Sequence, residues 1–444
     1  MKISAKTPPI TAVEARNIIQ MHTDSFGVFL DLDRILEYIF EYSVRSVKYT
    51  KALCNIAKVP DYKVTNSNET KSILINRLGV DPAALTVRGK ISTDGKLLKK
   101  IADDIKGSGT ALEEFLHYYI PARGEAQLLS YLNSYLELPI VNGVDNDKHR
   151  MVVAHPKWTI QSTSRIGASE PNIQQISRTI GDIITAPEGY RLIRSDSGQI
   201  EPRIMWSHFI PDKLIANLIT AYDDAYLAYY DYITMRPDRE EKLRMDFEHN
   251  FVKLEINDAV KAKRQELKRM SLAAGYGSSL PADAGFDPQL ARLYTARISN
   301  HELRKVQEQK IADYVKNGGD TFYGAFGTPV KPDATDKYEP GKSGWTEHLI
   351  RCGINNPIQT TASELMLFAV NRSHGIINSK CKDSHIGYYK HDEGCFYINE
   401  DNGDLDYADE LGDCQSYEVE GWIPIHSEME IGRKKWNEDV IRLL

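Results

Sequence analysis

Apolar residues recur at steps of three and four over long stretches of this chain, which is the pattern of a helix with one buried face. Residues 30–56 follow this pattern with Leu, Ile, Tyr and Val, and residues 111–138 repeat it. The pattern is again mostly helical over residues 211–316, and a further helix is expected over 356–370, after Pro357. The sequence therefore predicts several long helices.

Two shorter stretches carry the β-branched and aromatic residues that are typical of strands. Residues 190–195, YRLIRS, follow a Pro-Glu-Gly turn and lead directly to Asp196. Residues 386–398, IGYYKHDEGCFYI, form two β-prone runs on either side of His-Asp-Glu-Gly. The acids of the second stretch are therefore expected at or near a hairpin turn.

Arg264, Lys268, Leu272 and Tyr276 stand four residues apart, a spacing that places them along one stripe of a helix. Two cations about one turn apart suit a polyphosphate, and an apolar residue followed by an aromatic one suits a base. Gly277 allows a backbone or a duplex to come close. The alternative is an ordinary amphipathic helix with solvated cations.

Three carboxylates are placed where strands end. Asp196 follows the first predicted strand, and Asp392 and Glu393 lie at the predicted hairpin turn. If the strand and the hairpin are neighbours in one sheet, the acids converge and repel unless a cation joins them. Hard oxygen ligands favour Mg²⁺ or Mn²⁺ over zinc. The alternative is that Asp196 caps a helix and the other two acids form an exposed turn.

Composition sets outer bounds on the kind of protein. A length of 444 residues allows two or three subdomains, and no apolar run is long enough to cross a membrane. The five cysteines are scattered without a C-x-x-C, which suggests a reducing cytoplasm and neither a zinc site nor a disulfide framework. A net charge of −7 argues weakly against nucleic acid, but local clusters of Lys and Arg at 88–106 and 253–269 could supply the contacts.

Five motifs in one order resemble those of the polymerase domain of family A DNA polymerases. They read S-R-I-G-A-S-E-P-N-I-Q at 164–174, D-S-G-Q-I-E-P-R at 196–203, R-x3-K-x7-Y-G at 264–277, R-C-G-I-N-N-P-I-Q-T-T-A at 351–362 and H-D-E at 391–393. The resemblance implies an α+β fold shaped as a right hand, with a thumb, a palm that holds an antiparallel sheet, and helical fingers.

The resemblance also implies subdomain bounds. They are an N-terminal extension at 1–22, a thumb at 23–150, a palm at 151–205 and 345–444, and fingers at 206–344. The family's proofreading exonuclease has no room in the first ~25 residues. The expectation is therefore a bare polymerase module, of a phage, plasmid or repair type, that acts in the cytoplasm.

The implied reaction adds dNTPs to the 3′-hydroxyl of a primer, with primer–template DNA as partner and no membrane. Asp196, Asp392 and the carbonyl of Ser197 would bind two Mg²⁺ ions, for which Mn²⁺ can substitute. Glu393 would be an auxiliary acid, and Lys268 would also protonate the leaving pyrophosphate.

The resemblance assigns two further groups of residues. The incoming nucleotide would contact Gln199, Glu201, Arg264, Lys268, Leu272 and Tyr276. The primer–template would contact Arg165, Asn172, Gln174, Arg351, Asn355, Gln359 and His391. Glu201 would exclude the ribose 2′-hydroxyl by occupying its space. The DNA contacts would meet minor-groove acceptors that every correct pair presents, and the alternative for each amide is a satisfied core side chain.

Four positions depart from the family pattern: Ser197, Gly198, Tyr226 and Leu272. Leu272 replaces a usual aromatic residue, which is expected to alter how the deoxyribose is positioned. Ser197 replaces a usual Tyr, which is expected to weaken ribonucleotide exclusion in primer extension.

Two rival functions remain open. The first is a single-subunit RNA polymerase of the phage type, which shares the pattern K-R…L…Y-G-S of residues 268–278. Such enzymes differ from this chain because they have a small residue in place of Glu201 and a Ser in place of Glu393. A non-catalytic primer–template binding module is the second rival, and the presence of Asp196 and Asp392 argues against it.

Overall fold

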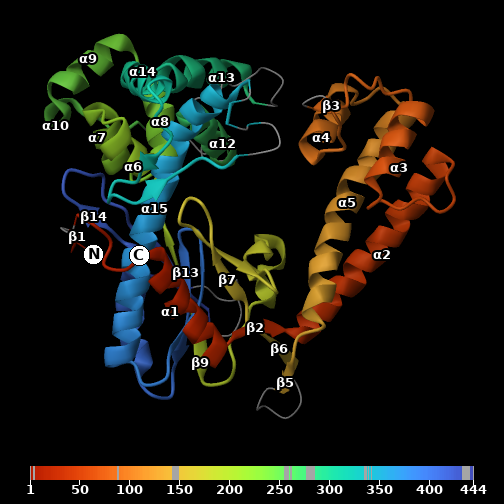
Figure 1. Ribbon diagram of the computed structural model, residues 1–444, viewed down its shortest axis with the longest axis horizontal. Coiled ribbons are helices and arrows are strands. Elements are labelled where there is room, and N and C mark those ends of the chain that lie inside the picture. The colour runs from red at the N-terminus through yellow and green to blue at the C-terminus, as the bar shows by residue number, and fades with distance from the viewer. Residues whose placement is uncertain are drawn as a thin grey trace. The chain divides into compact units, whose positions relative to one another are not determined.

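The computed structural model describes residues 2–3, 6–87, 90–142, 150–254, 260, 263–276, 286–334, 338, 340–341, 343–432 and 441–443. The chain forms two compact units (Figure 1). Unit 1 comprises Met1–Val28, His155–Ile176 and Gly189–Leu444, and unit 2 comprises Phe29–Ala154 and Ser177–Glu188. The bounds of each unit's elements follow.

Unit 2 is built on two long helices that lie side by side, α2 (Leu32–Ala57) and α5 (Ala111–Tyr135), coloured red to orange in Figure 1. Its core includes the fully buried Leu53, Phe115 and Tyr119. The smaller elements are β2 (Val28–Asp31), α3 (Ser67–Ser72), η1 (Ile73–Arg77), β3 (Thr86–Val87), β4 (Lys90–Ile91), α4 (Gly95–Asp104), β5 (Ile140–Asn142), β6 (Arg150–Ala154) and η3 (Arg178–Ile183). Strands β2, β6 and β5 form one sheet in that order.

The two helices predicted for this unit are present, with one shifted start. The chain from Val28 is a strand, and α2 begins only at Leu32. The reason is a cap, because the carboxylate of Asp31 accepts a hydrogen bond of 2.9 Å from the Arg34 N–H.

Unit 1 contains a central antiparallel sheet with the strand order β12-β13-β9-β15-β16. These strands are β9 (Tyr190–Ser197), β12 (His385–Lys390), β13 (Glu393–Asn399), β15 (Ser427–Gly432) and β16 (Ile441–Leu443). The strand expected at 190–195 is therefore present and extends through Asp196, and the expected hairpin is β12–β13. Each of these strands pairs with its neighbour antiparallel.

Helices supply most of the rest of unit 1. They are α1 (Ala12–Ser25), α6 (Ile200–Ile204), α7 (Lys213–Tyr222), α8 (Ala225–Thr234), α9 (Pro237–Met245), α10 (Phe247–Asn250), α12 (Arg264–Gly275), α13 (Pro288–Tyr294), α14 (Glu302–Lys316), α15 (Trp345–Lys380) and α16 (Ala408–Gly412). Short helical turns are η2 (Ile173–Gln175), η4 (Met205–Phe209), η5 (Thr295–Ser299), η6 (Asp404–Tyr407) and η7 (Asp413–Gln415). Short strands are β1 (Lys2–Ile3), β7 (Lys157–Ile160), β8 (Ile166–Ser169), β10 (Phe322–Tyr323), β11 (Pro329–Val330) and β14 (Glu418–Val419).

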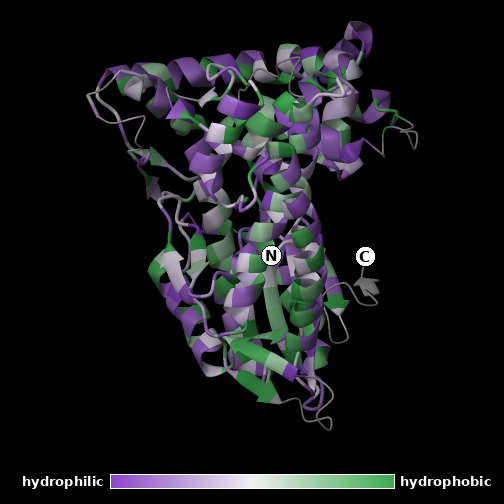
Figure 2. Ribbon diagram, turned by 90° about the vertical axis from the view of Figure 1, so that its right-hand side faces the viewer, coloured by the Kyte–Doolittle hydropathy of each residue, from purple (hydrophilic) through white to green (hydrophobic). Residues whose placement is uncertain are grey.

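In Figure 2 the helices carry both hydrophobic and hydrophilic positions, as helices with one buried face do. Helices combined with antiparallel sheets make the fold α+β, as expected. None of the helices in the described part of the chain combines the length and the hydropathy that a membrane span requires.

The prediction was wrong about where α15 begins. The helix starts at Trp345, runs through Pro357 and ends at Lys380. Proline removes one N–H and crowds the carbonyl four residues earlier, which here belongs to Gly353. The helix continues because Pro357 and its neighbour Ile358 are buried, and packing of such a face outweighs one lost hydrogen bond.

Three histidine rings join α1 to the sheet and to α15. The Nε2 of His22 lies 3.1 Å from the Nδ1 of His374, and the ring centroids of His22 and His385 are 6.1 Å apart. Phe26 stacks on His385 at 4.1 Å. Burial lowers the pKa of His22 to about 4, and the two facing histidines lower it in the same direction. The contact therefore requires neutral rings.

Acidification is expected to weaken this contact. Because the folded-state pKa of His22 lies below its unfolded value of about 6.5, its contribution is present above pH 6.5 and is lost as the pH falls toward 4. For His22 alone the loss at pH 5 is about 2 kcal/mol. Thermal unfolding between pH 7.5 and pH 5, followed by circular dichroism, measures it.

The matched variants separate this site from general acid effects. His22→Asn, which does not titrate, is expected to lose less stability on acidification than the wild type. His249→Asn, at a histidine whose side chain is 82% exposed, should keep the wild-type profile. An unchanged pH dependence in His22→Asn would refute the role of His22.

Candidate active site

Strand register brings acidic side chains together at the end of β9. Asp196 lies directly opposite Glu393 on β13 and directly opposite Glu428 on β15. Opposite residues in an antiparallel pair share a face of the sheet, so the three carboxylates form a row across three strands. Asp392 adjoins this row, because its carbonyl accepts a 3.0 Å hydrogen bond from the Ser197 N–H. The two segments are neighbours, as the convergence of the carboxylates required.

The turn between β12 and β13 consists of two residues, His391 and Asp392, because Lys390 pairs with Glu393. His391 adopts the left-handed region with φ 59°, which tight hairpin turns require. Glu393 therefore belongs to the strand. Its carboxylate forms an ion pair with Arg194 and accepts a 3.2 Å hydrogen bond from the Tyr388 hydroxyl. Glu393 is thus occupied by contacts within the protein.

Asp392 has a strongly perturbed carboxyl group. Its pKa is raised to about 6, chiefly by burial and also by the nearby charges of Glu201 and Glu393, while Arg165 opposes the rise. A carboxyl group in this setting gains from a cation that neutralises the cluster.

The donor set suits magnesium. Within the residues that the structure describes, no group of three or more His, Cys, Asp or Glu side chains is arranged to hold a metal. Mg²⁺ is commonly held by one or two carboxylates together with water and substrate phosphates, rather than by a closed protein cage. Asp196 and Asp392 are the candidates for such a pair, because a backbone bond joins their segments. The side chain of Ser197 takes no part in this face, since its hydroxyl donates to the Gln415 carbonyl at 2.9 Å.

Glu201 joins three of the motifs that were found in the sequence. Gln199 adopts a left-handed conformation with φ 54° and starts α6, so that Glu201 lies in the first turn of that helix. One carboxylate oxygen of Glu201 pairs with Arg165 at 2.7 Å, and the other accepts a hydrogen bond from the Tyr276 hydroxyl. Its side chain is only 21% exposed. Two partners therefore fix the carboxylate in one orientation.

The stripe on α12 has the expected geometry up to Tyr276, whose N–H bonds to the Leu272 carbonyl at 3.0 Å. The Arg264 guanidinium and the Lys268 ammonium lie over the ring of Tyr226, at 5.4 and 5.9 Å from its centroid. Lys268 is exposed and Leu272 is partly buried, whereas the Gly that follows Tyr276 falls outside the described residues. Both cations therefore lie over the same aromatic ring, that of Tyr226.

The residues expected to contact DNA fall into two groups. The side-chain oxygens of Asn172 and Asn355 are buried and have no hydrogen-bond partner among the described residues. The amide of Gln174 is instead occupied, since it accepts from the Ala168 N–H and donates to the Ile166 and Tyr389 carbonyls at 2.8–3.0 Å. Gln174 therefore fits the alternative interpretation of these amides, in which the side chain is hydrogen-bonded within the protein core and does not contact DNA.

The remaining candidates lie on α15 and on the hairpin turn. Arg351, Asn355 and Gln359 are four residues apart on α15 and share one face of it. Arg351 is exposed, with its guanidinium 5.2 Å from the Tyr338 ring centroid. His391 lies at the turn, where partial desolvation of its ring, together with the charges of Arg165 and Lys390, lowers its pKa.

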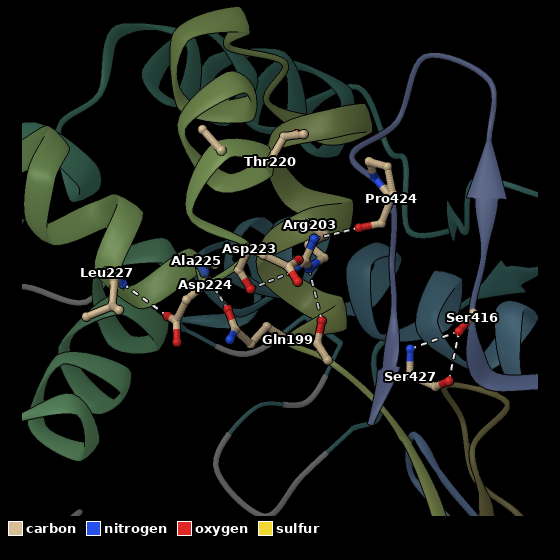
Figure 3. A network of polar contacts seen from close by, with 12 residues as sticks. Gln199, Arg203, Thr220, Asp223, Asp224, Ala225, Leu227, Ser416, Pro424 and Ser427 are labelled. Carbon is tan, nitrogen blue, oxygen red and sulfur yellow. Dashed lines mark hydrogen bonds and ion pairs between the residues drawn. The ribbon is translucent and has the colours of Figure 1, made fainter. Parts of the chain in front are cut away.

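Sequence reasoning missed a network beside this site, which Figure 3 shows. Arg203 is 3% exposed and donates to the carbonyls of Gly198, Pro424 and Asp223 at 2.6–3.1 Å, and to the Asp223 carboxylate at 2.8 Å. The side-chain oxygen of Gln199 accepts a hydrogen bond from the Ala225 N–H. The feature of the sequence that could have indicated this network is Arg203 itself, which is the last residue of the motif at 196–203.

Figure 3 also shows hydrogen bonds between Ser416 and Ser427, at the start of β15. The hydroxyl groups of Ser416 and Ser427 are 2.8 Å apart, and the Ser427 N–H donates to the Ser416 hydroxyl at 2.9 Å. Gly198 N–H donates to the His426 carbonyl at 2.8 Å. These bonds secure the segment that follows Asp196.

Comparison with known proteins decides the family. Residues 34–282, more than half of the chain, match the sequence model of DNA polymerase family A. The chain belongs to DNA polymerase family A. This family A chain is 24% identical to DNA polymerase I of Pseudomonas aeruginosa over 353 residues, which are 77% of this chain and 35% of that protein.

Further relatives agree. DNA polymerase I of Mycobacterium tuberculosis is 22% identical over 396 residues, 84% of this chain and 38% of that protein, so the chain spans little more than a third of these relatives. The fold is similar to that of the POL domain of Pol1 from M. smegmatis, whose structure is a complex with DNA primer-template and dNTP. The TM-score is 0.74 at 19% identity, over 95% of this family A chain and 69% of that one.

The Arg203 network generates a stability prediction. Arg203→Lys keeps one charge but cannot make the several directed bonds of a guanidinium, so buried carbonyls lose their donors. The free energy of unfolding is expected to fall by about 2–4 kcal/mol. Urea unfolding measures it, with Arg236→Lys, at a side chain that is 82% exposed, as the control that changes little.

Proposed function

We propose that this family A chain is a template-directed DNA polymerase, which adds dNTPs to a primer 3′-hydroxyl and releases pyrophosphate. The observation that carries the proposal is the register of β9 against β13. In that register Asp196 lies opposite Glu393, the residue after Asp392, and the Ser197 N–H bonds to the Asp392 carbonyl. The structural neighbour from M. smegmatis, which is a complex with DNA primer-template and dNTP, supports the same function.

Subdomain roles are part of the proposal. Residues 23–150 would be the thumb, 151–205 and 345–444 the palm, and 206–344 the fingers, after an extension at 1–22. The coiled pair of helices α2 and α5 in unit 2 and the central sheet of unit 1 support this division.

Asp196 and Asp392, with the backbone carbonyl of Ser197, would hold two Mg²⁺ ions, and Mn²⁺ could take their place. When bound, the ions supply a lowered pKa for the primer hydroxyl and charge neutralisation for the triphosphate. Glu393 would act from the side, as an auxiliary acid whose carboxylate Arg194 and Tyr388 hold in place.

The fingers residues would bind the nucleotide. Arg264 and Lys268 would pair with the β- and γ-phosphates, and the exposed Lys268 ammonium would donate a proton to the leaving pyrophosphate. Leu272 would pack near the sugar and base, and Tyr276 would stack at the template side. The net charge of −7 does not favour phosphate binding, so the proposal depends on these local cations.

Sugar choice would lie with Glu201. Because Arg165 and the Tyr276 hydroxyl each hold one of its carboxylate oxygens, Glu201 cannot swing aside to admit a 2′-hydroxyl without losing two bonds. Gln199 would support the start of α6, which carries Glu201, by accepting a hydrogen bond from the Ala225 N–H. The fixed carboxylate supports discrimination by exclusion.

Primer–template contacts would come from the segment around Arg165 and Asn172, from α15 and from the turn between β12 and β13. The side-chain oxygens of Asn172 and Asn355 are buried and have no partner in the part of the chain that the structure describes, so a ligand could satisfy them. Arg165, Arg351, Gln359 and His391 complete the proposed set, which leaves out Gln174 because its amide is already bonded to backbone groups. The cysteines described are all free, which suits action in a reducing cytoplasm.

Removing one carboxylate tests the proposal. Asp392→Asn is expected to reduce primer extension with Mg²⁺ by at least about a thousandfold, because one metal ligand loses its charge. Binding of primer–template DNA should remain close to that of the wild type, as measured by fluorescence anisotropy.

Asp238→Asn, at an acid whose side chain is 57% exposed in α9, is the control that keeps wild-type extension. Extension at the wild-type rate by Asp392→Asn would contradict the assignment. DNA binding by a wild-type chain that extends no primer would instead favour a binding module.

A further inference from the structure

One carboxylate at the start of α8 serves two partners. The Oδ1 of Asp224 accepts hydrogen bonds from the N–H groups of Tyr226 and Leu227, at 2.9 and 3.1 Å, and so caps the helix. Its Oδ2 accepts a 2.7 Å bond from the Nε of Arg264 on α12. The Asp224 side chain is 16% exposed, so this ion pair is largely shielded from water. Figure 3 shows the cap.

The geometry leaves the outer end of Arg264 available. A guanidinium has five N–H donors, and Asp224 takes the one at Nε, on the side of the group. Among the residues that the structure describes, Arg264 has no second hydrogen-bond partner, and its side chain is 38% exposed. The ring of Tyr226 lies beneath it at 5.4 Å. The side chain is therefore held on two sides, while its terminal nitrogens remain free for an anion.

The turn that carries Asp224 is bonded to the segment that follows β9, at Gln199 and Arg203. Asp223 pairs with Arg203 at 2.8 Å, and the Ala225 N–H bonds to the side chain of Gln199. Through three consecutive residues the turn thus connects the segment that follows Asp196 with the helix that carries Arg264. The turn therefore links the guanidinium of Arg264 to the segment that follows Asp196.

We propose that Asp224 is the positioning residue for Arg264, and that it orients the guanidinium so that its terminal nitrogens meet the triphosphate of the incoming nucleotide. The inference rests on the proposed polymerase function. Asp224 does not touch the substrate and acts through Arg264 alone. Its second role, the helix cap, does not require a charge, because Asn caps helices as well as Asp does. An Asn whose single oxygen caps the helix turns its NH2 group, a donor, toward the guanidinium, so only a carboxylate serves the cap and Arg264 together.

Asp224→Asn therefore separates the two roles. The variant keeps the cap and loses the charged partner of Arg264. Steady-state primer extension is expected to show a rise in the KM for dNTP of about tenfold or more, the equivalent of one charge-assisted hydrogen bond. The kcat should change by much less, because the carboxylates of β9 and β13 are untouched.

A double-mutant cycle distinguishes positioning from a general structural effect. Arg264→Ala alone should also raise the KM, and adding Asp224→Asn to it should change the KM no further, because the partner through which Asp224 acts is gone. Asp212→Asn is the matched control, since Asp212 also caps a helix, α7, and pairs with an arginine, Arg244, at 3.1 Å. That variant should leave the KM for dNTP unchanged.

The outcomes are separable. If wild-type extension occurs and Asp224→Asn leaves the KM unchanged, the positioning role is overturned and the polymerase function stands. If Asp224→Asn raises the KM equally with and without Arg264, the effect is structural, and the positioning role is again overturned. A wild-type chain that extends no primer would overturn the proposed function and this inference together.

Discussion

The antiparallel pairing of β9 with β13 is the constraint on which the candidate site depends. Asp196 and Asp392 are separated by nearly 200 residues in the chain. The ladder of β9 against β13, from Asp196 opposite Glu393 to Tyr190 opposite Asn399, holds their segments in this register, and the bond from the Ser197 N–H to the Asp392 carbonyl extends it. A slip of one residue would turn Asp196 to the opposite face of the sheet, away from its partner. The buried hydroxyl of Ser197 resists that slip, because it is bonded to the Gln415 carbonyl on the other face.

Helix α12, which carries Arg264 and Lys268, is attached to this sheet indirectly. Glu201 connects α6 to α12 through Tyr276, and Asp224 connects α8 to α12 through Arg264. Arg203, almost fully buried, ties the same corner to the segment that precedes β15 through the Pro424 carbonyl. Charged groups at these three junctions are expensive to bury, so each pair specifies one arrangement and a lost partner is costly. The site therefore depends on polar contacts as much as on apolar packing.

Much of the fold and of the candidate site could be predicted from the sequence. The strand at Tyr190, the hairpin around His391 and the helix from Arg264 each follow from a local period, and the resemblance to family A was confirmed by the family match. The start of α15 was not predictable, because a local rule stops a helix near Pro357 whereas tertiary packing carries it through. The partners of Asp223 and Asp224 were also hidden, since an acid before a helical run indicates a cap and does not reveal which distant arginine it meets.

The assignment of individual residues shows the same limit. Gln174 and Asn172 look alike in the sequence motif, yet the amide of Gln174 is used up by backbone groups while the oxygen of Asn172 is left without a partner among the described residues. Only the surroundings of each side chain, which depend on segments far away in the chain, distinguish the two.

We propose that this chain synthesises DNA and that Glu201 selects the sugar. Primer extension on a primed template with Mg²⁺, with dNTPs and rNTPs offered separately, tests it most directly. We expect extension with dNTPs, little extension with rNTPs, and a gain of rNTP extension of about tenfold or more when Glu201→Ala opens the space that the fixed carboxylate fills. Extension that is as fast with rNTPs as with dNTPs in the wild type, or none with either, would contradict it.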